Sequence, residues 1–143
     1  MTAPDSREDV WTGLTDGALD VTAVHAFLTD ERAGGTCVFV GTSRRWTGDA
    51  ETDLLTYESY RPMAEAELDR LATVAAERWP TERVAVLHRL GAVPPPEASV
   101  VVGVACAHRA EAFEAARWLI DAVKASVPIW KTEHDSERSD SHG

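Results

Sequence analysis

The segment Ser99–Ala107 constrains the fold more than any other part of the chain. It reads Ser-Val-Val-Val-Gly-Val-Ala-Cys-Ala, so almost every residue is small and apolar. A strand with one face in water alternates polar and apolar residues, whereas an unbroken apolar run is typical of a strand buried on both sides. We therefore expect a β-strand that is covered on both faces. The chain has 143 residues, of which 44% are hydrophobic, which suffices for one domain with one core and argues against global disorder.

Hydrophobic periodicity and breaker residues divide the rest of the chain into alternating strands and helices. Besides 99–107, strands are expected at 10–14, 36–40, 54–60, 83–90 and 129–134, and helices at 21–32, 62–79 and 109–124. Two segments are predicted as loops: 41–49, which contains two arginines between glycines, and 91–97, whose three prolines prevent it from joining a central ladder. The order β-α-β-β-α-β-β-α-β predicts an α+β fold with a mostly antiparallel sheet and three helices.

Composition limits the organisation and the function classes. We expect one domain at 10–134, between flexible segments at 1–9 and 135–143. The net charge of -10 argues against general nucleic-acid binding, because such a chain repels a phosphate backbone. The chain shows no bilayer-spanning apolar run and no signal-peptide pattern. Cys37 and Cys106 lie in apolar runs, which indicates buried thiols in a reducing compartment and hence a cytoplasmic protein. The five histidines show no ligand spacing with either cysteine, so we expect no metal site.

Lysine occurs at only two positions, Lys124 and Lys131, while arginine occupies the other twelve basic positions. An ammonium group can shuttle a proton or attack a carbonyl carbon, which a guanidinium cannot do at neutral pH. The two lysines are therefore candidate catalytic residues. The alternatives are that both are surface charges, or that Lys124 only caps the C-terminus of the helix that ends near it.

The other basic residues of interest lie at the ends of predicted elements. Arg44 and Arg45 follow a strand, and His108 and Arg109 lie where a strand passes into a helix. Side chains at element ends are frequently functional, and arginine binds phosphate in a bidentate way. We expect these residues to join the lysines in a pocket for an anion, to which the free N–H groups at the start of the helix would add. A solvated turn for the arginine pair and a core position for the histidine remain the alternatives.

Six short motifs together resemble the large, catalytic subunit of molybdopterin synthase. The most specific part is His108-Arg109 followed by Lys124-Ala-Ser-Val-Pro-Ile-Trp-Lys131-Thr-Glu133. The similarity runs from about Val10 to Glu133, with Ser43 and Val127 where the family usually has a hydrophobic residue and alanine. The motifs are Phe39–Arg44, Leu55–Tyr60, Val86–Gly91, Val102–Arg109, Ala112–Ala115 and Lys124–Glu133.

The resemblance implies an α/β-hammerhead-like fold and a homodimer within a heterotetramer. Each end of the dimer would dock a small ubiquitin-like sulfur carrier, whose Gly-Gly tail ends in a thiocarboxylate. That sulfur would convert cyclic pyranopterin monophosphate to molybdopterin, without a metal or other cofactor. The resemblance also implies the site: Lys124 and Lys131 as catalytic residues, and Thr42, Ser43, Arg44, His108, Arg109, Thr132 and Glu133 as substrate-binding residues. It leaves open whether His108 and Arg109 reach the substrate from the same protomer or from the second one.

Two other functions compete with a sulfurtransferase. A non-catalytic dimeric module that binds an anion or phosphorylated metabolite would need the same positive charges, and would tolerate arginine in place of Lys131. An enzyme that forms a Schiff base would instead use Lys124 as a nucleophile toward a carbonyl substrate. Without the resemblance, the residues alone indicate an α+β domain with an anion pocket.

Overall fold

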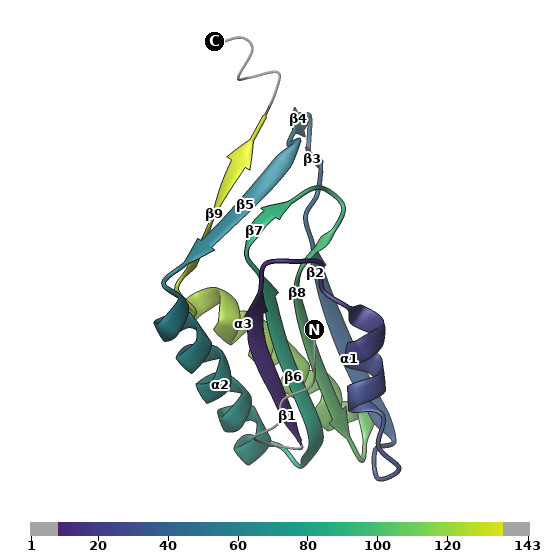
Figure 1. Cartoon of the computed structure of the whole chain (residues 1–143). Helices are drawn as coiled ribbons and strands as arrows, with labels where there is room; N and C mark the ends of the chain where they lie inside the picture. The colour runs from purple at the N-terminus through teal and green to yellow at the C-terminus, as the bar shows by residue number, and fades with distance from the viewer. Residues whose placement is uncertain (1–8, 136–143) are drawn as a thin grey trace.

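The structure is a computed structural model that describes residues 9–135. It contains three helices and nine strands in that part of the chain (Figure 1). The expectations of flexibility at 1–9 and 135–143 concern residues that lie almost wholly outside the described range. No helix within 9–135 is long and apolar enough to cross a membrane.

A four-stranded sheet forms the body of the molecule. Its strand order is β1-β6-β8-β2, and β8 lies inside it between two neighbours. All residues from Ser99 to Cys106 are buried, which confirms the expected strand with both faces covered. Pairing is antiparallel except between β1 and β6, which run parallel. The strands are β1 (Val10–Thr15), β6 (Thr81–Arg89), β8 (Ala98–Cys106) and β2 (Gly35–Thr42).

Helices cover both faces of this sheet. On one face lie α2 (Arg61–Arg78) and α3 (Arg109–Ser126), and on the other lies α1 (Val21–Leu28) (Figure 1). The two faces bury separate apolar clusters, one under α2 and α3 and one under α1. Successive side chains of a strand point to opposite faces, so each of the inner strands contributes to both clusters. This arrangement explains why their sequences are apolar throughout.

A second, three-stranded sheet stands at one end of the body (Figure 1). Its order is β7-β5-β9, and both pairings are antiparallel. It consists of β5 (Leu54–Ser59), β9 (Ile129–His134) and β7 (Gly91–Val93). The α+β class with three helices and mostly antiparallel strands is confirmed, but the strands form separate sheets rather than one.

Three local expectations were wrong. The first helix ends at Leu28 rather than near residue 32, because the Asp30 carboxylate accepts the Arg32 amide at 2.8 Å and holds a turn. The predicted loop 41–49 contains β3 (Trp46–Thr47), which pairs with β4 (Ala50–Glu51) in a short hairpin. The connector after residue 90 begins with strand β7. Strand β7 is an edge strand and ends before the prolines. The prolines lack N–H groups, but no strand pairing depends on them there.

Both cysteines are free. Cys106 is buried and Cys37 is half-buried. Burial raises the pKa of the Cys106 thiol to about 11, so it stays protonated and behaves as a small apolar side chain. The expectation for Cys106 therefore holds, whereas Cys37 is only partly covered.

Candidate active site

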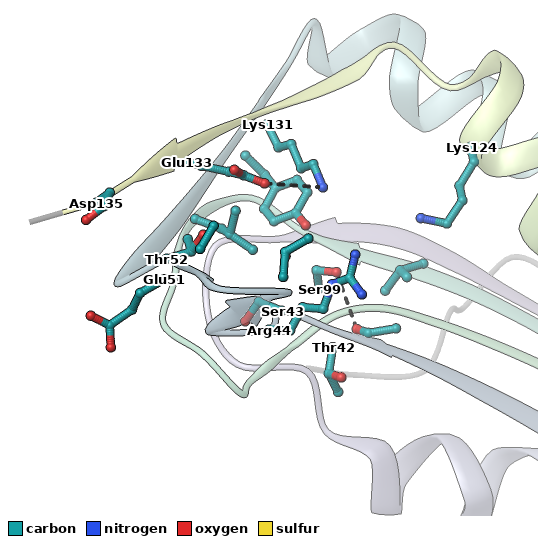
Figure 2. Close-up of a pocket in the computed structure, with 16 residues that line it drawn as sticks. Thr42, Ser43, Arg44, Glu51, Thr52, Ser99, Lys124, Lys131, Glu133 and Asp135 are labelled. Carbon is teal, nitrogen blue, oxygen red and sulfur yellow. Dashed lines mark hydrogen bonds and ion pairs between the residues drawn. The ribbon is translucent and has the colours of Figure 1, made fainter. Parts of the chain in front are cut away.

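Both lysines face the same space at the end of the four-stranded sheet. Lys124 lies in the last turn of α3, and Lys131 lies on β9 across from Tyr57 of β5. They line one cavity of about 380 Å³ (Figure 2). Both also line an adjoining cavity of about 290 Å³. The α3 helix is held by the core and β9 belongs to the small sheet, so the cavity lies between the two parts of the molecule.

The loop after β2 forms a further wall of this cavity. Thr42, Ser43 and Arg44 all line it, as the resemblance implies. A register irregularity between Gly41 and Thr42 redirects the chain at that point. Ser43 is buried, and both its amide and its hydroxyl donate to the Glu97 carbonyl, at 2.9 and 3.1 Å. The loop backbone is therefore fixed beneath the cavity.

The structure separates the roles of the two adjacent arginines. Arg45 forms ion pairs with Asp53 at 3.1 Å and Glu51 at 3.9 Å, which tie it to the neighbouring hairpin segment. Arg44 lines the cavity, and within residues 9–135 it makes no ion pair. The alternative of two arginines in a solvated turn fits Arg45 only in part, because Arg45 is held by carboxylates. Arg44 remains available for an anion.

Carboxylates also line the cavity. Glu133 lies two residues after Lys131 on the same face of β9, and their charged groups are 3.9 Å apart. Glu51 and Asp135 also line the space (Figure 2). The cavity is therefore lined by both cations and carboxylates, rather than by positive charge alone.

Thr132 does not line the cavity. It lies on β9 between Lys131 and Glu133, and alternate residues of a strand point to opposite faces. Both of its neighbours face the cavity, so Thr132 faces away from it. Its side chain is therefore not placed in this cavity, and its assignment as a substrate-binding residue stays a prediction.

His108 and Arg109 lie at the other end of the sheet. They begin α3 directly after β8, close to Gly35, where an added Cβ would lie 2.8 Å from the Arg109 Cα. Val100, which lines the cavity, is eight residues earlier on an extended strand, which corresponds to roughly 25 Å. Within one chain these residues therefore do not join the cavity. Their role at the site stays a prediction that requires a second copy of the chain.

Two cavity residues that the sequence analysis did not select are Tyr57 and Ser99. Tyr57 pairs across the strands with Lys131, so the pairing of β5 with β9 would have identified it. Ser99 donates to the Gly41 carbonyl at 3.3 Å and so holds the start of the loop. It is the only polar residue in its strand, which was the available signal.

His88 lines the adjoining cavity together with both lysines. Its Nδ1 donates to the Arg89 carbonyl at 2.7 Å, and its ring meets the Tyr57 ring edge-on at 5.2 Å between centroids. Burial lowers the pKa of His88, and the positive charge of Lys124 adds to this effect. The hydrogen bond to the carbonyl opposes it in part. A neutral imidazole is therefore favoured at neutral pH.

Lys124 is exposed and forms no ion pair or hydrogen bond with any residue in 9–135. It lies in the last turn of α3, where the negative end of the helix dipole attracts a cation. With Arg44, it gives the cavity two cations that no carboxylate of residues 9–135 neutralises. Such a site can bind an anion and supply a proton to it.

Comparisons with known proteins agree on one family. Residues 14–126 match the family described as MoaE protein. The chain is 42% identical over 128 residues to the molybdopterin synthase catalytic subunit of Bos taurus, which covers 90% of this chain and 68% of that one. A crystal structure of molybdopterin synthase from Staphylococcus aureus superposes with a TM-score of 0.80 at 33% identity, over 85% of this chain and 88% of that one. A complex of subunits 1 and 2 of the molybdopterin-converting factor from Helicobacter pylori, at 23% identity, shares the fold with a TM-score of 0.72 over 85% of this chain and 83% of that one.

Proposed function

Since this chain belongs to the family of molybdopterin synthase catalytic subunits, we propose that it transfers sulfur to cyclic pyranopterin monophosphate to form molybdopterin. The sulfur comes from the C-terminal thiocarboxylate of a small partner protein. The observation that carries the proposal is that Lys124, Lys131 and Arg44 reach one cavity from three different elements. No resident metal or cofactor is needed for this chemistry.

Each of the three cations has a distinct task. Arg44 binds the cyclic phosphate of the substrate, because a guanidinium matches phosphate geometry. Lys124 is the principal acid–base residue, since attack by the thiocarboxylate opens the ring phosphate and later expels water, and each step needs a proton transfer. Lys131 holds the carboxyl end of the partner and stabilises the negative charge that develops on the acyl group.

The assembly is a homodimer of this chain that docks one small Gly-Gly-tailed partner at each end. A relative with the same fold is known as a complex of two different subunits, which supports a small-subunit partner. In this assembly the second protomer supplies His108 and Arg109, which do not reach the cavity within one chain.

The test is sulfur transfer in a reconstituted system. The chain is mixed with a thiocarboxylated Gly-Gly-tailed partner and the cyclic pterin substrate, and product is followed by mass spectrometry. We expect Lys124→Ala and Lys124→Arg each to lower the rate by roughly 10²–10⁴-fold, because neither side chain donates a proton at neutral pH. Arg117→Lys, on an exposed position of the same helix, serves as the matched control and should leave the rate unchanged. Full sulfur transfer by Lys124→Ala would refute the proposal.

The same experiment separates the enzyme from an anion-binding module. A module requires only charge, so Lys124→Arg and Lys131→Arg would retain binding of the phosphorylated ligand, and no product would form with the wild-type chain. An enzyme that forms a Schiff base would give a borohydride-trapped adduct on Lys124 with a carbonyl substrate.

A further inference from the structure

A buried arginine connects the interior of the fold to the loop that carries Arg44. Arg89 is the last residue of β6, and its side chain is only 11% exposed. Its guanidinium donates to the Glu97 carboxylate at 2.7 Å, across the connector that joins β7 to β8. The pair therefore fixes the point at which the chain enters β8.

The guanidinium depends heavily on this one carboxylate. Its Nε is buried and has no hydrogen-bond partner among residues 9–135. A buried cation is stable only when it is paired and hydrogen-bonded, so loss of Glu97 would leave the positive charge uncompensated. The Glu97 side chain is itself half exposed, so the cost falls mainly on Arg89.

The backbone of Glu97 also fixes the loop that carries Arg44. Its carbonyl accepts both the amide and the hydroxyl of Ser43, the residue directly before Arg44. On the other side, the Arg45 carbonyl accepts the Thr52 amide at 2.6 Å. Both neighbours of Arg44 are thus fixed, while its own side chain stays free to face the cavity.

We infer that Arg89 and Glu97 are positioning residues that set the orientation of Arg44 for the phosphate of the substrate. They touch neither the cavity nor the reacting atoms, and they act through Ser43. The inference rests on the proposed function, because it assigns Arg44 to the phosphate. Because Arg44 is assigned to the phosphate, which the substrate already carries before it reacts, its misplacement should weaken substrate binding more than it slows the chemical step.

The test compares Glu97→Gln, Arg89→Met and the double variant in the sulfur-transfer assay with the partner protein. We expect each single variant to raise KM for the pterin substrate about tenfold and to change kcat less than about threefold. The double variant should resemble the single ones, because all three remove the same link. Arg89→Lys should restore part of the affinity. Hydrogen exchange of the Ser43 amide should accelerate about tenfold in the single variants, because its acceptor is released.

Asp30→Asn is the matched control, since it removes an arginine-bound carboxylate at the opposite end of the same sheet. It should leave KM and Ser43 exchange unchanged. Unchanged KM in folded Glu97→Gln, an equal rise of KM in the control, or a rise of KM without faster Ser43 exchange would each overturn the inference. If the wild type transfers no sulfur, the proposed function fails, and the dissociation constant for inorganic phosphate then tests the positioning role. A tenfold weaker binding of phosphate by the single variants supports that role. Unchanged binding in the variants, or no phosphate binding by the wild type, overturns it.

Discussion

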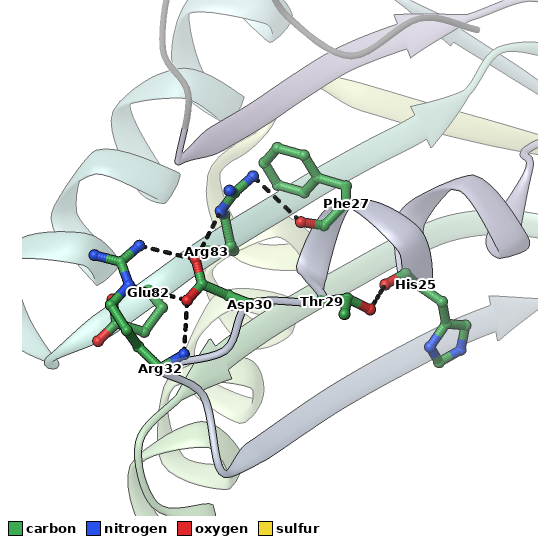
Figure 3. Close-up of polar contacts among 7 residues, drawn as sticks. All are labelled: His25, Phe27, Thr29, Asp30, Arg32, Glu82 and Arg83. Carbon is green, nitrogen blue, oxygen red and sulfur yellow. Dashed lines mark hydrogen bonds and ion pairs between the residues drawn. The ribbon is translucent and has the colours of Figure 1, made fainter.

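The two ends of the four-stranded sheet use charged residues in opposite ways. At one end, which we call the paired end, Asp30 contacts Arg32 at 2.8 Å and Arg83 at 3.5 Å, and Glu82 contacts Arg32 at 3.2 Å (Figure 3). At the other, which we call the cavity end, Arg44 and Lys124 make no ion pair with residues 9–135 (Figure 2). Cations that already have carboxylate partners stabilise the fold, whereas cations left without them are available to a ligand.

The comparison also explains why the two lysines matter more than the count of basic residues suggests. The Arg83 guanidinium lies over the Phe27 ring, 5.2 Å from its centroid, and donates to the Phe27 carbonyl. Its positive charge therefore already has partners within the protein. Lys124 has no such contact among the described residues. The proposed division therefore predicts that variants of the ion-paired residues at the paired end change stability, and that variants of the cations that line the cavity at the cavity end change rate.

The largest expected effect is at the cavity end. Lys131→Met should lower the rate of sulfur transfer about 10²-fold, because it removes a positive charge placed where negative charge develops. The free energy of unfolding should change by less than about 0.5 kcal/mol, since Lys131 is exposed and its contact with Glu133 is 3.9 Å long. Single-turnover kinetics and urea unfolding measure the two quantities. If Lys131→Met were destabilised but transferred sulfur at the normal rate, the proposed role of the cavity end would be contradicted.

A smaller effect is expected at the paired end. Arg83→Met keeps most of the apolar stem but removes the contacts with Asp30 and the Phe27 carbonyl, so the free energy of unfolding should fall by about 1 kcal/mol. The kinetic constants should not change. Arg70→Met is the control, because its pair with Glu67 lies on the surface of α2 and its loss should destabilise the fold less than that of Arg83. A raised KM in Arg83→Met would show that the two ends are not independent.

The smallest expected effects are losses of stability at low pH. The group at the cavity end and the group at the paired end should lose their contributions at different pH values. His88 has a pKa lowered from 6.5 by burial, so the unfolded state binds more protons below pH 6.5 and stability falls there. The Arg32 hydrogen bond, with the charges of Arg32 and Arg83, holds the pKa of Asp30 well below its usual 3.8. Its contribution is complete above pH 3.8 and is lost only as the pH falls further.

Unfolding free energies measured from pH 7 to pH 3 test this order. His88→Gln should flatten the slope just below pH 6.5, and Asp30→Asn should flatten it only below pH 3.8. The order would be contradicted if His88→Gln left the slope between pH 6.5 and pH 5 unchanged.

Most of the fold could be predicted from the sequence, because its main elements are long and strongly patterned. The strand at 98–106 and the helices after Tyr60 and His108 carry enough apolar residues to be unambiguous. Strands β3, β4 and β7 have only two or three residues, which is too short for a period to appear. Strand β7 pairs with β5, which is distant in sequence. The pairing of β3 with β4 depends on a turn at Gly48, where φ is 61°.

The site was predictable in part, and mainly through the resemblance. Both lysines and the loop at 42–44 face one cavity, as expected. The resemblance implied Thr132 as well, but strand alternation turns its side chain away from the cavity that Lys131 and Glu133 line. The sequence predicted that His108 follows the strand at 99–107, but it could not show that the cavity lies at the start of that strand.

The short link between Ser126 and Ile129 has a consequence for how this chain can diverge. Lys124 moves with a helix embedded in the core, while Lys131 is carried by a strand paired only with β5. Inserting or deleting a single residue in the link would shift the strand by one position and present Trp130 or Thr132 to the substrate in place of the ammonium. The length of this link is therefore as constrained as the identity of the two lysines that it separates.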